Sequence, residues 1–233
     1  CDRAVVSIFV NPAQFAPNED FDKYPRTFDD DLARVAAAGG SLIWAPPVSE
    51  MYREGAATRV VPKGAALGLE TDFRPHFFEG VATVCCKIFT QVGPDIAVFG
   101  EKDYQQLAVI RRMVTDLGWP IAVVGVPTVR EPDGLAMSSR NGYLSAEQRA
   151  HAPLLAQTLN EVADQLRSGE RDYSALEQAA AQVLNGGGFR TDYVSIRRPD
   201  LQPAEAGDAR LVILAAARLG TTRLIDNLPV SLD

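Results

Sequence analysis

The sequence predicts an α/β fold, a Rossmann-like doubly wound parallel sheet followed by a smaller C-terminal α+β domain. Along the first half of the chain, short and nearly all-apolar runs alternate with helical patterns, as expected for parallel strands that helices cover on both faces. After residue 127, turn-rich segments and helices are followed by closely spaced apolar runs, which is an α+β pattern. We therefore expect a domain at residues 1–128 and a second at 129–233.

The first domain contains four expected strands connected by helices. The strands are the apolar runs 4–10, 42–45, 96–99 and 121–124. A helix is expected between Thr27, which can cap it, and Gly39. A second helix over about 80–93 has one wide apolar face, and a third covers about 104–117.

In the second domain, two sequence patterns predict capping boxes at helix starts. They are Ser145 with Gln148 and Ser174 with Glu177. Short strands are expected at 193–196, 211–214 and 224–225.

Composition excludes several classes of protein. The 233 residues include 30 acidic and 23 basic side chains, a net charge of −7, which argues against a nucleic-acid coat or a polybasic membrane anchor. No apolar run approaches the roughly 18–20 residues of a membrane span. Cys1 and the pair Cys85–Cys86 are neither a disulfide framework nor a metal-ligand set, so we expect a reducing cytoplasm. Because the chain starts at Cys1, just before a strand, we also expect it to be part of a longer protein.

Residues 99–106 join the third expected strand to a helix, where backbone N–H groups and the positive helix end face one crevice. Gly100 allows a ligand close to the backbone, and Lys102 suits phosphate. Asp103 either accepts hydrogen bonds from hydroxyl groups or caps the helix. The alternative for the whole segment is a solvated charged turn.

A second polar segment, residues 135–141, contains Ser138, Ser139 and Arg140. Two hydroxyl groups and a guanidinium are well suited to bind an anion. Turn signals on both sides predict a mobile loop, and a plain polar linker is the alternative.

Gln14 follows the first expected strand, and its amide suits a hydroxyl next to a carboxylate. The alternative there is a simple Asn-Pro turn. Asp30 and Asp31 could help to hold Mg²⁺, although acidic residues in a first helical turn more often complement the helix dipole. His76 and His151 cannot build a three-histidine zinc site, and neither Cys85 nor Cys86 has a catalytic setting.

Six stretches together resemble the pantoate–β-alanine ligase (pantothenate synthetase) family, in the family's order and over essentially the whole chain. The stretches are residues 6–15, 22–27, 99–106, 124–130, 134–141 and 216–224. Gly-Glu-Lys-Asp-Tyr-Gln-Gln at 100–106 and Met-Ser-Ser-Arg at 137–140 are the most specific.

The resemblance implies a nucleotidyltransferase-type Rossmann domain, a homodimer, and condensation of pantoate with β-alanine through a pantoyl-adenylate intermediate, with release of AMP and pyrophosphate. It implies that ATP and Mg²⁺ are needed. The ATP-binding residues would be Gly100, Glu101, Lys102, Asp103, Val129, Met137, Ser138, Ser139 and Arg140. Among them, Lys102, Ser138, Ser139 and Arg140 would be catalytic.

For the other ligands, the resemblance implies that Gln14 and Gln106 hold pantoate, with Gln14 also near β-alanine. Asp31 or Asp30 would lie near Mg²⁺. No nucleic acid or membrane is expected as a partner.

The chain departs from the family's pattern in two places. The phosphate-binding segment Pro-Thr-Met-Gly-Ala-Leu-His-x-Gly-His, expected before residue 4, is not in this sequence. The family's Arg-Pro-x-His-Phe also reads Arg74-Pro-His-Phe-Phe here, so Phe77 stands at the usual histidine position. Two alternatives therefore stay open: another adenylate-forming or nucleotidyl-transferring enzyme, and a non-catalytic nucleotide-binding module.

Overall fold

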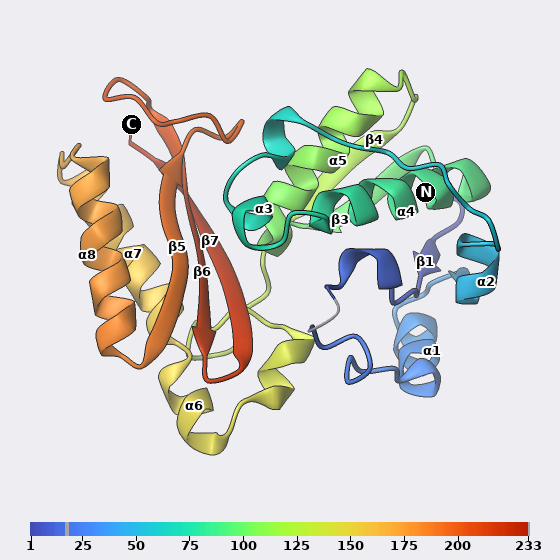
Figure 1. The fold of residues 1–233 in the computed structure, drawn as a ribbon, viewed down its shortest axis with the longest axis horizontal. Coiled ribbons are helices and arrows are strands. Elements are labelled where there is room, and N and C mark those ends of the chain that lie inside the picture. The colour runs from blue at the N-terminus through green and yellow to red at the C-terminus, as the bar shows by residue number, and fades with distance from the viewer. Residues whose placement is uncertain (17–18, 233) are drawn as a thin grey trace. The chain divides into compact units, whose positions relative to one another are not determined.

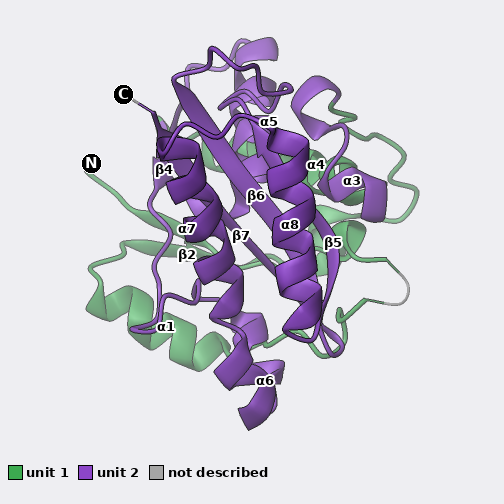
Figure 2. Cartoon of the chain, turned by 90° about the vertical axis from the view of Figure 1, so that its left-hand side faces the viewer, with its two compact units in different colours: residues 1–62, 74–95 green, residues 63–73, 96–233 purple. Residues whose placement is uncertain are grey.

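The computed structural model describes residues 1–16 and 19–232 (Figure 1). The chain forms two compact units, residues 1–62 with 74–95 and residues 63–73 with 96–233 (Figure 2). Within the described ranges, no helix has both the length and the apolar character that a membrane crossing needs. The domain boundary expected at 128/129 is a different division of the chain and stays a prediction.

The first unit contains a parallel pair of strands, β1 (Val5–Ser7) and β2 (Leu42–Trp44), joined through the 3₁₀ helix η1 (Pro12–Gln14) and helix α1 (Phe28–Ala37). The parallel pairing confirms the prediction, but β1 is shorter than the expected run 4–10. Two prolines follow β2 at 46–47 and offer no N–H groups to a neighbouring strand, so β1 has no ladder partner beyond that point.

Helix α4 (Phe77–Val92) supplies most of the apolar core of the first unit, as its wide apolar face predicts. Its buried apolar residues recur at helical spacing: Phe78, Val81, Ala82, Val84, Cys85 and Phe89. Gly93 ends the helix in the left-handed conformation, at φ +61°, which glycine adopts without steric cost. Burial raises the pKa of the Cys85 thiol to about 12, so Cys85 is a core residue and not a nucleophile. The short helix α2 (Val48–Met51) adds the fully buried Met51.

At Gly80, α4 approaches η1 too closely for a side chain. A Cβ at this position would lie 2.6 Å from the carbonyl carbon of Ala13 and 2.8 Å from the Gln14 nitrogen. Both contacts are with backbone, which cannot move aside as a flexible side chain can. Glycine at 80 is therefore required for this packing.

The second unit contains another parallel pair, β3 (Ile96–Gly100) and β4 (Ala122–Val126), with Ile96 opposite Ala122. Between them lie the 3₁₀ helix η3 (Glu101–Asp103) and helix α5 (Tyr104–Asp116). The strand–helix–strand order over 96–126 is as predicted. The segment 63–73 adds η2 (Gly64–Ala66) and α3 (Glu70–Phe73).

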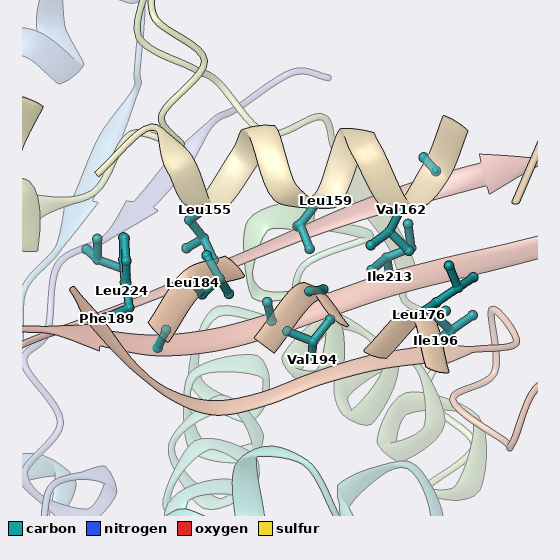
Figure 3. Packing of buried hydrophobic residues seen from close by; sticks show 14 of the residues in the cluster. Leu155, Leu159, Val162, Leu176, Leu184, Phe189, Val194, Ile196, Ile213 and Leu224 are labelled. Carbon is teal, nitrogen blue, oxygen red and sulfur yellow. The ribbon is translucent and has the colours of Figure 1, made fainter. Parts of the chain in front are cut away.

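The C-terminal part is an antiparallel sheet in the order β5-β6-β7, covered on one face by two helices (Figures 1 and 2). The strands are β5 (Phe189–Arg197), β6 (Arg210–Leu219) and β7 (Thr222–Ser231), and the helices are α7 (Leu154–Arg167) and α8 (Tyr173–Gly186). Leu159 of α7 and Leu176 of α8 pack with Ile213 of β6 in the core on this face (Figure 3).

The opposite face of the same sheet is also covered. Val212 and Leu214 of β6 pack with Leu69 and the ring of Tyr104. Side chains alternate between the two faces of a strand, so the middle strand β6 is buried along nearly its whole length and reads as an almost continuous apolar run.

One predicted capping box is confirmed and the other is wrong. Ser145 and Gln148 bond reciprocally at the start of α6 (Ala146–His151). Helix α8 instead begins after Asp172, whose carboxylate accepts from the Ala175 N–H at 3.0 Å. Glu177 cannot form the box because its carboxylate accepts from the Ile196 N–H of β5 at 2.6 Å.

Substituting Gly80 by alanine should destabilise the protein by about 1–3 kcal/mol, as an overpacked contact does. The added methyl group would meet the backbone of η1. Urea unfolding monitored by circular dichroism measures the effect.

Gly186→Ala is the matched control, because a Cβ at Gly186 in α8 meets no atom within 4 Å. This variant should be as stable as the unmodified protein or slightly more stable, since alanine favours helix. Equal stability of Gly80→Ala and the unmodified protein would contradict the assigned packing.

Candidate active site

The segment that follows β3 is a turn with an open approach to its backbone. Gly100 is extended (φ −71°, ψ 134°), and a Cβ there would meet no atom within 4 Å, so one side of the backbone is open. Asp103 occupies the N-cap position of α5, but its side chain makes no capping hydrogen bond. Of the two roles predicted for Asp103, the structure therefore excludes the helix cap.

Asn227 holds this turn in place from β7. Its side-chain nitrogen Nδ2 donates to the carbonyls of Glu101 (2.8 Å) and Lys102 (2.9 Å). Asn227 is buried, with 3% of its surface exposed, so water does not compete for these bonds. The turn that carries Lys102 is thereby fixed to the C-terminal sheet by its backbone, while the Lys102 side chain remains half-exposed.

The neighbouring residue of β7, Asp226, holds a second segment. Its carboxylate accepts two hydrogen bonds from the guanidinium of Arg130, at 2.7 and 2.9 Å. Hydrogen bonding to Asp226 raises the pKa of Arg130, so the guanidinium stays charged. Arg130 also donates to the carbonyls of Gly134 and Asn227, at 3.0 and 3.2 Å.

Arg130 lies in a short hairpin that places predicted nucleotide contacts side by side. An isolated antiparallel bridge joins Arg130 to Ala136, and Met137 donates its N–H to the Val129 carbonyl at 2.9 Å. Val129 and Met137 are thus neighbours across the hairpin, and both are exposed, by 66% and 49%. Two apolar side chains left in solvent at a hairpin end suit the face of a flat aromatic ligand.

The hairpin runs directly into the predicted anion-binding loop. Ser138 caps the 3₁₀ helix η4 (Ser139–Tyr143), because its hydroxyl accepts from the Arg140 N–H at 3.2 Å. Asn141 fastens the other side of the loop by donating to the Ala136 carbonyl at 3.1 Å. The residues from Val129 to Arg140 therefore form one hydrogen-bonded hairpin and loop. The ion pair of Arg130 with Asp226 attaches this segment to β7.

Two predicted nucleotide-binding segments, 100–103 and 129–140, are brought together in this way. They are attached to adjacent residues in the middle of β7, so both lie beside the same part of the C-terminal sheet. Arg130, Asp226 and Asn227 were not among the predicted site residues. The signal for the last two was present in the sequence, since they interrupt an otherwise apolar strand, Leu-Ile-Asp-Asn-Leu at 224–228.

The predicted pantoate residues belong to different units. Gln106 lies on α5 of the second unit, and Gln14 lies in η1 of the first. Within its unit, Gln14 is held by Arg74, which donates to the Gln14 carbonyl at 3.0 Å and forms a buried ion pair with Glu19 at 2.6 Å.

The two residues of the altered histidine motif have distinct positions. His76 is exposed at the N-cap position of α4. Phe77 lies beneath the guanidinium of Arg74, which is 3.9 Å from its ring centroid. Phe77 thus supports the arginine that holds Gln14.

Asp30 and Asp31 lie in the first turn of α1, where negative charge complements the helix dipole. Asp31 is contacted by the Thr27 hydroxyl at 3.4 Å, a weak interaction that takes the place of the expected backbone cap. Over residues 1–16 and 19–232, no group of three or more histidine, cysteine or acidic side chains could hold a metal ion.

Comparison with known proteins identifies the family. The family model described as pantoate-beta-alanine ligase matches residues 1–229. The chain belongs to the pantoate–β-alanine ligase family. The pantothenate synthetase of Methylococcus capsulatus is 54% identical over 234 residues, which covers 99% of this chain and 82% of the relative. That of Pseudomonas fluorescens Pf-5 is 56% identical over 235 residues, covering 100% of this chain and 82% of the relative.

Solved structures agree with this assignment. The Thermus thermophilus pantothenate synthetase is similar with a TM-score of 0.92 and 47% identity, over 97% of this chain and 83% of the other. The Francisella tularensis pantoate-beta-alanine ligase, solved with beta-gamma ATP and β-alanine, has a TM-score of 0.78 and 31% identity, over 97% and 79%. The predicted nucleotidyltransferase-type α/β fold is therefore confirmed. The protein is a ligase that condenses pantoate with β-alanine at the expense of ATP.

Substituting Asn227 by alanine should raise the KM for ATP about tenfold or more, because two hydrogen bonds that hold the 101–103 turn are lost, at about 1 kcal/mol each. Steady-state kinetics with varied ATP measures the change.

Asn185→Ala is the matched control. The Asn185 side chain also accepts a backbone hydrogen bond, from Thr191 at 3.0 Å, but this partner belongs to neither predicted nucleotide-binding segment. An equal KM for ATP in both variants would show that the turn does not depend on Asn227.

Proposed function

We propose that the turn at Gly100–Asp103 and the loop Met137–Arg140 bind ATP, with Val129 and Met137 against the base. The supporting observation is that adjacent residues of β7, Asp226 and Asn227, hold both segments. Lys102 meets the phosphates as a point charge. Ser138, Ser139 and Arg140 supply hydroxyl, backbone and guanidinium donors to the same phosphates, and Glu101 lines the turn.

The reaction explains why such groups are needed. A carboxylate is a poor electrophile, so a pantoate oxygen first attacks the α-phosphorus of ATP, the bond to the β-phosphate oxygen breaks, and pyrophosphate leaves. The β-alanine nitrogen then attacks the activated carbonyl carbon, loses a proton, and AMP departs. Negative charge develops on phosphate oxygens in the first step, so Lys102 and Arg140 act as fixed positive groups that stabilise its transition state. Closure of the 137–140 loop excludes water, which would otherwise hydrolyse the acyl adenylate.

Mg²⁺ fits this scheme as an ion carried by the nucleotide. Magnesium is usually held through one or two carboxylates together with substrate phosphates and water, and the described residues offer no dedicated cage. Asp31, with Asp30 beside it, is our proposed protein ligand, and the ion would neutralise phosphate charge.

Gln14 and Gln106 bind pantoate in this proposal, and Gln14 also lies near β-alanine. An amide offers a donor and an acceptor, which matches a substrate with hydroxyl groups beside a carboxylate. We further propose that the protein is a cytoplasmic homodimer with domains at 1–128 and 129–233. The proposed location is supported by the cysteine usage of the sequence, which is not that of a disulfide framework, and the proposed dimer is supported by the family resemblance.

Exchange of labelled pyrophosphate into ATP tests the proposed order of steps. The exchange should require pantoate and should proceed without β-alanine, because adenylation precedes amide formation. Exchange that is unaffected by pantoate would contradict an adenylate of this acid and would favour another acid substrate.

Lys102→Ala should lower kcat/KM for ATP by about 10²-fold or more, as the loss of a group that stabilises transition-state charge does. Its melting temperature should change little, because the turn is held by its backbone. Lys63→Ala, which removes an exposed lysine of the same unit, is the control and should keep full activity. A loss below threefold in Lys102→Ala would contradict the role assigned to Lys102.

A further inference from the structure

A buried asparagine connects Gln14 to a tyrosine that the proposed mechanism does not use. Asn11 precedes η1 and has 2% of its surface exposed. Its oxygen Oδ1 accepts from the Ala13 N–H (3.2 Å) and from the Tyr52 hydroxyl (2.7 Å). Its nitrogen Nδ2 donates to the Gly80 carbonyl (3.0 Å) and to Oε1 of Gln14 (3.2 Å). All four hydrogen-bonding directions of the Asn11 amide are thus used.

Two backbone groups set which end of the Asn11 amide faces Gly80, and the Tyr52 hydroxyl helps to hold the amide in that position through its oxygen. The Ala13 N–H can only donate, and the Gly80 carbonyl can only accept. The opposite orientation would therefore place oxygen against oxygen at Gly80 and nitrogen against N–H at Ala13. Since Nδ2 must face Gly80, it also faces Gln14, and Gln14 must present its oxygen Oε1 to Asn11. The amide nitrogen Nε2 of Gln14, with two N–H donors, is then directed away from Asn11.

Tyr52 completes this arrangement from the end of α2. Its hydroxyl is the only side-chain donor that reaches Oδ1 of Asn11 among the described residues. Burial raises the pKa of Tyr52, so the hydroxyl stays protonated and remains a donor at physiological pH. Its ring is held by two cations, with the guanidinium of Arg59 5.9 Å and the ammonium of Lys87 5.4 Å from the ring centroid.

We propose that Tyr52 is a positioning residue for pantoate, acting through Asn11 to hold the Gln14 amide with its Nε2 donors toward the substrate. The inference rests on the proposed function, in which Gln14 binds pantoate. A carboxylate or a hydroxyl oxygen can accept hydrogen bonds from the two N–H donors of Nε2. If the Gln14 amide were rotated, its oxygen would face the pantoate carboxylate, and two acceptors cannot form a hydrogen bond. A Gln14 amide held in this orientation favours an anionic acid at this position.

The variant Tyr52→Phe tests the proposal, because it removes the hydroxyl and keeps the ring. The KM for pantoate should rise about fivefold to tenfold, the value of one hydrogen bond of roughly 1 kcal/mol, while the KM for ATP and kcat stay within twofold. A merely structural role would lower the melting temperature and the active fraction without changing the KM for pantoate. That result would overturn the proposal.

Tyr173→Phe is the matched control. The Tyr173 hydroxyl also donates a hydrogen bond, to the Glu205 carbonyl at 3.0 Å. However, Tyr173 lies on α8 of the second unit, whereas Asn11 and Gln14 belong to the first. Its KM for pantoate should equal that of the unmodified enzyme.

The double variant with Gln14→Ala separates the inference from the proposed function. If Tyr52 acts through Gln14, Tyr52→Phe should have no further effect on the KM for pantoate once Gln14 is alanine. Equal effects in both backgrounds would overturn the inference and leave Gln14 as a pantoate residue. A normal KM for pantoate in Gln14→Ala alone would overturn the proposed role of Gln14, and the inference with it.

Discussion

The candidate active site depends on two adjacent side chains of β7, Asp226 and Asn227. They lie in a buried strand, where an unpaired carboxylate or amide would be costly. Each finds its partners in a different loop, Arg130 for Asp226 and the Glu101–Lys102 backbone for Asn227. Satisfying these buried polar groups thereby stabilises two loops that carry the proposed phosphate-binding residues.

A second buried ion pair stabilises the same unit on the other face of the sheet. Arg223 of β7 donates to Glu70 and to Asp192, both at 2.7 Å. Burial alone would lower the pKa of Arg223, but the two carboxylates outweigh it and raise the pKa. The contact fastens the segment 63–73 to the C-terminal sheet, and Gln105 adds a hydrogen bond from the Glu70 N–H at 3.2 Å. Strand β7 thus supplies the polar anchors on which the loops of this unit depend.

In the first unit, a predicted site residue is positioned by a close approach of two backbone segments. Gly80 lets α4 lie against η1, and its carbonyl then reaches the side chain of Asn11. That contact directs the Asn11 amide nitrogen toward Gln14 as well. A glycine far along the chain from Gln14 therefore influences how the Gln14 amide is oriented. The turn at Asn11–Pro12 thus both ends the strand and positions Gln14.

Local features of this protein were determined by the sequence alone. The apolar strand segments, the apolar face of α4 and the capping box at Ser145 depend on neighbours a few residues away, and each was predicted from the sequence. The chemistry of Lys102, Ser138, Ser139 and Arg140 was likewise predicted, although their contacts with substrate stay predictions. The wrong prediction of a capping box at Ser174 shows the limit of local sequence patterns, because the Glu177 carboxylate instead accepts a hydrogen bond from Ile196 of β5. Only the tertiary structure brought Asn227 to the Lys102 turn and Asn11 to Gly80, since hydrogen bonds between residues far apart in the chain exist only once packing has placed donor and acceptor within reach.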